Sequence, residues 1–167
     1  MGAVRAVRTI SQAEYLQTER LAPTKSEYLA GRVIAMAGAS YAHNRLSTNI
    51  AANLHLALRN KPCVVLGSDM RVKIAEVNAY FYPDVVIVCG QPQFEDEQKD
   101  NLLNPTLREY LLVAQDRTHL EHFICQPDGQ WSCRVYDQPE QSVAFLGGAV
   151  SLPLQAIYEG IFFSQEA

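Results

Sequence analysis

Residues 80–89 read Tyr-Phe-Tyr-Pro-Asp-Val-Val-Ile-Val-Cys, and this stretch says more about the fold than any other. Four β-branched residues, Val85 to Val88, follow Pro83-Asp84 without a break, as expected of a central strand that is buried on both faces. Pro83 suits a strand start or a bulge, where no backbone donor is needed. The stretch therefore predicts a strand over residues 80–89 at the centre of a sheet.

The flanking sequence predicts a mixed sheet with few helices. Ser11 and Glu14 form a capping box that begins a helix reaching about Arg20. Residues 25–38 have the pattern of a hairpin, and Ser40 caps a longer helix to about Asn60. One apolar stripe runs along that helix at four-residue spacing: Leu46, Ile50, Leu54 and Leu58. Further strands are predicted at residues 63–67, 70–74, 109–114, 119–125, 131–137, 143–146 and 150–154, with a polar loop over 90–105. This order indicates an α/β protein of the α+β mixed-sheet kind, forming a single domain over residues 1–167.

Composition narrows the classes of function. The chain has 167 residues and a net charge of −4, which argues against nucleic-acid binding through overall positive charge. It does not exclude a metal-dependent nuclease, because an acidic site attracts the cation that then faces phosphate. No apolar run is long enough for a membrane helix and no secretory signal precedes the domain, so a cytoplasmic protein without a membrane partner is expected. Motifs for kinases, dehydrogenases, serine hydrolases and zinc sites are absent. The four cysteines are expected to be buried free thiols rather than disulfides.

A few polar residues stand where chemistry could occur. Asp84 enters an apolar strand, which is costly unless the carboxylate is hydrogen-bonded or binds a cation; the alternative is an aspartate that caps a turn. Glu27 lies on the first hairpin and is either a partner of Asp84 or a solvent-facing glutamate. Asp69 is best explained as a turn residue. His43, in the first turn of the long helix, could face the carboxylates or a phosphate, or could be structural.

An ordered set of short motifs resembles the Uma2 family of restriction endonucleases. The set comprises residues 27–33 (EYLAGRV), 36–40 (MAGAS) with His43, 68–72 (SDMRV), 83–88 (PDVVIV), 109–113 (EYLLV) and 150–158. The resemblance implies the restriction-endonuclease-like fold of the PD-(D/E)XK nucleases, with a central mixed sheet flanked by helices. It also implies hydrolysis of DNA by water bound to Mg²⁺ or Mn²⁺. Asp84 would be a metal ligand, Glu27 an accessory acid, and His43, Arg71 and Lys73 contacts to substrate phosphate.

The sequence departs from the family pattern after Leu107. There the family continues into a strand with the second catalytic acid and a helix with the lysine, whereas here Leu107 runs directly into Arg108-Glu109. About two dozen residues are absent by this comparison. Three explanations stay open: a shortened, degenerate member; Glu109 serving as the replacement catalytic acid and metal ligand; or a segment of the natural protein that this sequence lacks.

Three functions follow from these observations. The first is a metal-dependent DNA endonuclease, and the second is a catalytically inactive nuclease-fold protein that acts as a DNA- or protein-binding module. The third is a small interaction module with no nucleic-acid role. One carboxylate rarely holds Mg²⁺ well, so the absence of the segment with the second acid weakens the case for an endonuclease. Its loss should also uncover apolar surface, which predicts a homodimer.

Overall fold

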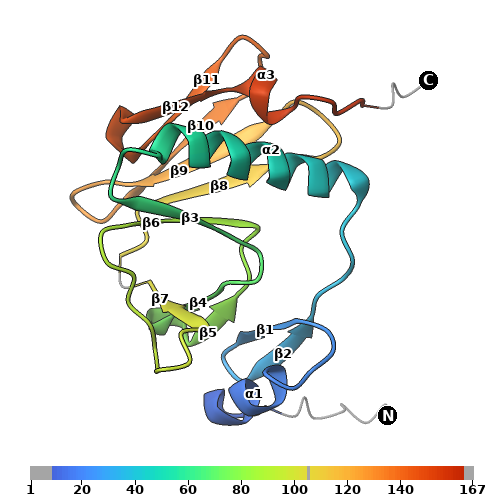
Figure 1. The fold of residues 1–167 in the computed structure, drawn as a ribbon, viewed down its shortest axis with the longest axis vertical. Coiled ribbons are helices and arrows are strands. Elements are labelled where there is room, and N and C mark those ends of the chain that lie inside the picture. Colours follow the sequence, from blue (N-terminus) through green and yellow to red (C-terminus); the bar gives the residue numbers. More distant parts are fainter. Residues whose placement is uncertain (1–8, 105, 164–167) are drawn as a thin grey trace, which may run out of the picture. The chain divides into compact units, whose positions relative to one another are not determined.

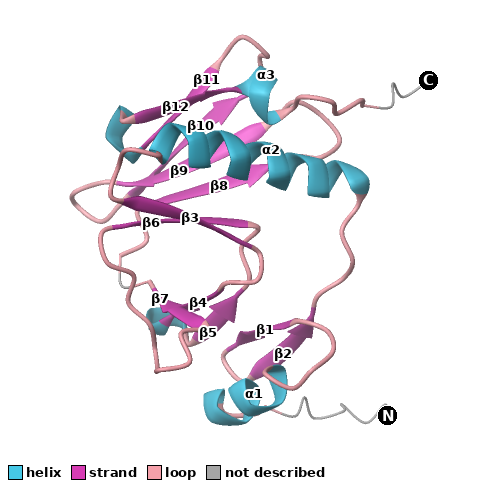
Figure 2. Ribbon diagram, viewed as in Figure 1, coloured by secondary structure: helices cyan, strands magenta, loops and turns pink. Residues whose placement is uncertain are grey.

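The computed structural model describes residues 9–104 and 106–163. By their internal contacts the residues fall into two compact units. Among the described residues the first unit comprises 9–38, 68–83 and 92–104, and the second comprises 39–67, 84–91 and 106–163. Each unit contains both helix and strand, and strands predominate (Figure 2). No helix within the described residues has the length and apolar character needed to cross a membrane.

The first unit is a five-stranded mixed sheet with one α-helix. Helix α1 (Gln12–Glu19) begins with the predicted Ser11–Glu14 capping box. The sheet has the order β2-β1-β5-β4-β7, in which only β4 and β7 run parallel. Its strands are β1 (Ser26–Leu29), β2 (Arg32–Ala35), β4 (Arg71–Ile74), β5 (Ala79–Phe81) and β7 (Asn101–Leu103), with the 3-10 turn η1 (Ala75–Val77) between β4 and β5. The core of this unit is aromatic: Tyr15, Tyr28 and Tyr80 are buried with ring centroids 5.1–5.9 Å apart.

The second unit packs helix α2 (Tyr41–Leu58) against several short sheets (Figure 1). Strand β3 (Cys63–Gly67) pairs with β6 (Val85–Cys89). The order β10-β9-β8 joins β8 (Glu109–Val113), β9 (Leu120–Cys125) and β10 (Trp131–Tyr136). Strand β11 (Ser142–Phe145) pairs with β12 (Val150–Pro153), with η2 (Leu146–Gly148) between them and α3 (Leu154–Ile157) after them. The predicted apolar stripe of α2 is confirmed, since Leu46, Ile50, Leu54 and Leu58 are all buried in the main core cluster.

The prediction of one central strand over residues 80–89 is wrong. The chain leaves β5 at Phe81 and begins β6 at Val85, so Tyr82-Pro83-Asp84 separates two strands that belong to different units. Pro83 has no N–H to donate to a ladder, which favours such a break. Strand β6 pairs only with β3 within the described residues, and Val85 to Val88 are half-buried rather than enclosed on both faces.

Two smaller predictions are also corrected. The stretch 90–105 was expected to be a loop, but it contains β7, which pairs in parallel with β4. The cysteines were expected to be buried and free, yet Cys63 and Cys89 form a disulfide and Cys133 is exposed. The physical reason is the register of β3 and β6, which sets Cys63 directly opposite Cys89. Spacing along the chain does not reveal such a register.

Candidate functional site

Asp84 and His43 form the clearest polar pair of the second unit. His43 Nε2 lies 2.8 Å from Asp84 Oδ1, and the two side chains are 35% and 50% exposed. The N-terminus of α2 positions the histidine, because the Ser40 side chain caps the helix by accepting a hydrogen bond from the His43 N–H. The start of β6 positions the aspartate. A solvent-accessible histidine–carboxylate pair of this kind can exchange a proton or bind a cation.

Glu109 makes contacts of a different kind. Its Oε2 lies 2.9 Å from His122 Nε2, and its Oε1 accepts a 2.8 Å hydrogen bond from the Leu146 N–H. His122 is completely buried, and its Nδ1 has no hydrogen-bond partner within the described residues. An ionised carboxylate can only accept, so Nε2 is the donor in this pair. Both oxygens of Glu109 are therefore occupied by its own unit.

The other proposed site residues lie in the first unit. Glu27 Oε1 accepts a 3.2 Å hydrogen bond from the Tyr82 N–H. The guanidinium of Arg71 is 3% exposed and contacts Asp100 at 2.7 Å, Tyr82 at 3.1 Å, and Asn101. Its donors are thus engaged inside the unit rather than turned toward solvent.

Lys73 and Asp69 are also paired within the first unit. Lys73 donates to Glu95, which also accepts from the hydroxyl of Tyr80 at 2.8 Å. Burial by itself would lower the pKa of Lys73, but the contacts with Glu95 and Tyr80 outweigh it and raise that pKa. Asp69 forms an ion pair with Lys25.

Sequence reasoning missed the polar network around Asp100. Arg20 donates to both carboxylate oxygens of Asp100 at 2.8 Å and to Asp96 at 2.7 Å. Hydrogen bonds from Arg20, with the charge of Arg71, hold the pKa of Asp100 below its usual value despite partial burial. Asp100 had been placed in a polar loop, and no local motif distinguishes it from its acidic neighbours.

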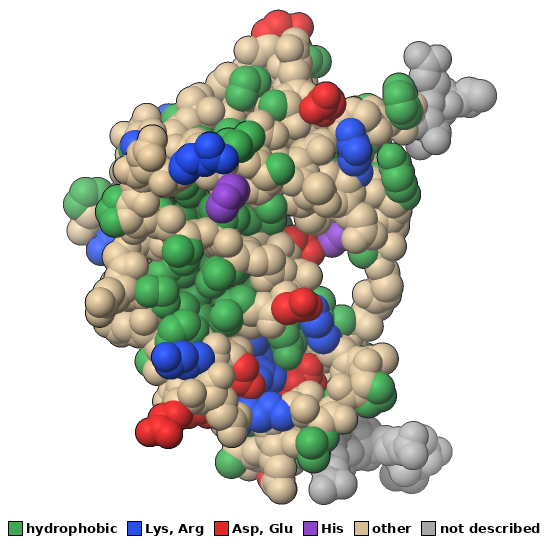
Figure 3. Space-filling model, viewed as in Figure 1, with side chains coloured by type: hydrophobic (Ala, Val, Ile, Leu, Met, Phe, Trp, Pro, Cys, Tyr) green, Lys and Arg blue, Asp and Glu red, His purple; other side chains and the backbone are tan. Residues whose placement is uncertain are grey.

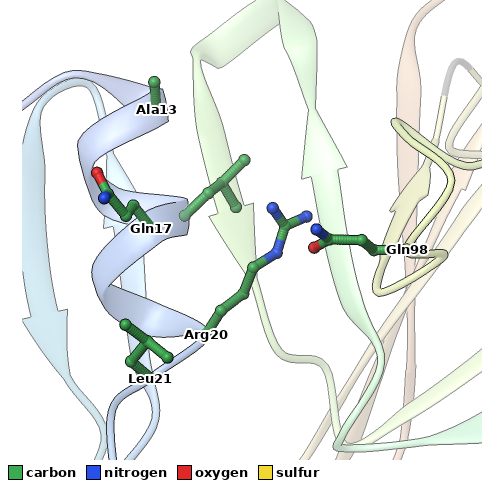
Figure 4. A pocket seen from close by; sticks show the side chains of 6 residues that line it. Ala13, Gln17, Arg20, Leu21 and Gln98 are labelled. Atoms are coloured by element: carbon green, nitrogen blue, oxygen red, sulfur yellow. The ribbon is translucent and has the colours of Figure 1, made fainter.

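A shallow pocket beside α1 offers little chemistry. It is lined by Ala13, Leu16, Gln17, Arg20, Leu21 and Gln98, and the Arg20 side chain extends toward Gln98 (Figure 4). Among the described residues that line it, Arg20 alone is charged, and it is already paired with two aspartates.

The donor set fits a divalent metal poorly. Among residues 9–104 and 106–163, no group of three or more His, Cys, Asp or Glu side chains is arranged to hold a metal ion. Mg²⁺ requires near-octahedral coordination by oxygen ligands. One oxygen of Asp84 is already paired with His43, so this carboxylate alone would leave almost all coordination positions to water and substrate. Figure 3 also shows basic side chains lying beside acidic ones at the surface.

Comparison with known proteins shows the family of this chain. Residues 12–107, more than half of the chain, match the model of the family Uma2, which is described as "Putative restriction endonuclease". This chain belongs to the Uma2 family. The match ends at Leu107, the residue after which the sequence leaves the family pattern.

Two Synechocystis sp. (strain ATCC 27184 / PCC 6803 / Kazusa) proteins are similar to this Uma2 chain. Uncharacterized protein sll1609 is 34% identical over 158 residues, covering 78% of this chain and 89% of the relative. Uncharacterized protein slr1290 is 25% identical over 179 residues, covering 92% and 94%. The covered parts of this chain, 78% and 92% of 167 residues, are about 130 and about 154 residues long. The alignments, over 158 and 179 residues, are longer than these parts by about 28 and about 25 positions. Each relative therefore carries about two dozen residues that have no counterpart in this chain.

A solved structure confirms the predicted fold. The crystal structure of a "putative nuclease belonging to DUF820" from Anabaena variabilis ATCC 29413 superimposes with a TM-score of 0.74. The superposition covers 92% of this chain and 99% of the other at 13% sequence identity. The restriction-endonuclease-like α/β fold thus persists in this Uma2 protein without the additional residues of its relatives.

Proposed function

We propose that this chain is a hydrolytically inactive member of the Uma2 family that acts by binding a partner protein. The observation that carries the proposal is that both carboxylate oxygens of Glu109 already accept hydrogen bonds. Glu109 is the acid that directly follows the position of the missing catalytic segment. Its oxygens accept hydrogen bonds from His122 and from the Leu146 N–H, and these contacts favour a structural role over a place beside Asp84 in a metal site. Asp84 remains with His43 as its hydrogen-bonding partner among the described residues.

The charge distribution supports a protein partner over DNA. The chain has 14 Lys and Arg residues against 18 Asp and Glu. In the part of the chain that the structure describes, five basic residues are already in ion pairs: Arg20, Lys25, Arg71, Lys73 and Arg117. DNA affinity depends on cations that are free to replace the counterions of phosphate, so paired cations contribute little.

A metal-dependent DNA endonuclease is the second candidate. Family membership and the accessible Asp84–His43 pair favour it. In that case Asp84 would bind Mg²⁺ or Mn²⁺, Glu27 would act as the accessory acid, and the substrate would be DNA.

Plasmid nicking distinguishes the two candidates. Supercoiled plasmid is incubated with the wild type, Asp84→Ala, His43→Ala and the control Asp69→Ala, each with Mg²⁺ or Mn²⁺. Asp69 is a suitable control because its carboxylate is almost fully exposed and its partner among the described residues is Lys25. We expect all four proteins to show the same background. Nicking by the wild type and Asp69→Ala that falls at least about tenfold in Asp84→Ala, a change of about 1.4 kcal/mol in the barrier, would establish the endonuclease instead.

A further inference from the structure

The three-stranded sheet of the second unit has one covered and one uncovered face. On the covered face Leu111, Leu120 and Tyr136 pack into the main core with α2. Side chains alternate between the faces of a strand, so their sequence neighbours point the other way. We call that side the outer face; it comprises Tyr110, Leu112, Glu121, Phe123, Cys125, Trp131, Cys133 and Val135.

The outer face is apolar and exposed. Its register forms three rows across the strands: Leu112–Glu121–Val135, Tyr110–Phe123–Cys133, and Cys125–Trp131. Four members retain about half of their maximal exposure: Tyr110 49%, Leu112 45%, Trp131 46% and Val135 51%. A sheet face of a lone domain normally carries polar residues at such positions. Clustered large apolar side chains mark a surface that is covered in use.

We infer that a second copy of this chain covers the outer face, so that the protein is a homodimer formed sheet against sheet. The first reason is charge. Among the three rows Glu121 is the one acidic or basic side chain that carries a formal charge near neutral pH, and it lies 3.3 Å from His119 of its own unit. The face therefore offers no charge pattern that would select an acidic or basic partner. An apolar face is complementary to itself, which a two-fold dimer requires.

The second reason is area. Half-exposed Tyr110, Leu112, Trp131 and Val135 expose on the order of 350 Å². With Phe123, the two thiols and the strand edges, each copy would bury roughly 500–600 Å². The total, roughly 1,100 Å², lies at the lower limit of specific interfaces. It therefore predicts a dimer of micromolar affinity rather than an obligate one.

The third reason is the comparison with relatives. The two Synechocystis proteins carry about two dozen residues that have no counterpart here. This chain has no counterpart of those residues among the ones described, so they are not present here to cover the outer face. The inference does not depend on hydrolysis, because among the described residues no outer-face side chain forms a hydrogen bond or ion pair with Asp84 or His43.

The test compares oligomeric state across matched variants. Mass is measured by sedimentation or light scattering from about 5 to about 200 µM, a range that brackets a micromolar affinity. The wild type should shift from 18.6 kDa toward twice that mass as concentration rises. Leu112→Lys and Val135→Lys should weaken the dimer at least about tenfold, since each sets a charge in the apolar contact. Leu56→Lys is the control, because Leu56 is 62% exposed on α2, outside the outer face.

Alkylation of Cys133 keeps the inference testable if a variant folds poorly. In the wild type, iodoacetamide should modify Cys133 more slowly at high protein concentration than at low concentration, as followed by peptide mass spectrometry. A wild type that stays monomeric at about 200 µM would overturn the inference. So would a dimer that Leu56→Lys weakens as much as Val135→Lys does. A monomer in which Cys133 is protected at every concentration would assign the face to another segment of the same chain, and would equally reject the second copy.

Discussion

Replacing Glu109 tests whether this residue is a structural brace or the surviving second acid of a nuclease site. Glu109→Ala leaves the Leu146 N–H without its acceptor and removes the one hydrogen bond that the His122 side chain makes among the described residues. An unsatisfied buried polar group costs about 1–3 kcal/mol. Two such groups, one fully buried and one partly exposed, predict a loss of about 2–4 kcal/mol in the free energy of unfolding.

A graded series makes this prediction specific. Glu109→Gln retains an oxygen that can accept from the Leu146 N–H, so its loss should be smaller, about 1–2 kcal/mol. Glu121→Ala is the matched control, because Glu121 lies three positions along the register from Glu109, on the opposite face, and makes a partly exposed pair with His119. Its effect should stay within about 0.5 kcal/mol.

Urea denaturation followed by fluorescence provides the measurement. Trp131 is the only tryptophan, and it lies on β10 of the same sheet as Glu109, so its emission reports on the second unit. The disulfide must be kept in one redox state throughout. If Glu109→Ala changes the unfolding free energy by less than about 0.5 kcal/mol while abolishing metal-dependent nicking, the structural assignment is refuted and Glu109 is a catalytic acid.

Three other predictions concern stability. Asp100→Asn should destabilise the first unit by about 2 kcal/mol, because it weakens two charge-assisted contacts, including one to a buried arginine. Folding lowers the pKa of Asp100, so its contribution to stability is present above the unfolded pKa of about 3.9 and is lost as the pH falls below that value. In thermal melts, the difference in melting temperature between the wild type and Asp100→Asn should therefore shrink from pH 7 to pH 3. Reduction of Cys63–Cys89, which closes a loop of 26 residues, should lower stability by about 3 kcal/mol, as measured by melting with and without reductant; an unchanged melting temperature would argue against the bond. Leu54→Ala, a truncation inside the α2 core, should cost about 2–4 kcal/mol in urea, and a loss below about 1 kcal/mol would contradict the packing described.

Local signals predicted much of the secondary structure. The capping box of α1, the serine cap of α2 and the four-residue spacing of its leucines act within one or two turns of helix, so their effects can be read from neighbouring residues. The hairpin over residues 25–38 was equally visible, and its turn lies at Ala30-Gly31, where both residues have positive φ, a conformation that Gly adopts easily.

Contacts between distant residues were much harder to predict. Asp84 was identified from a costly polar residue at the entry to an apolar strand, and His43 was expected to be able to face a carboxylate; the structure brings these two together. Glu109 could be singled out only by its place beside the missing segment. Its pairing with His122 depends on the register of β8 and β9, which no local pattern specifies.

The sequence by itself determined the helix caps, the apolar stripe, most strand positions and the family, because these rest on periodicity, on short-range hydrogen bonding and on motif order. Only the tertiary structure decided that residues 80–89 divide between two units, that Cys63 faces Cys89, and that Arg71 is buried among its partners. The physical reason is that strand pairing joins residues far apart along the chain. A shift of one position in register would send every side chain to the opposite face, so the sequence pattern alone leaves those partners undetermined.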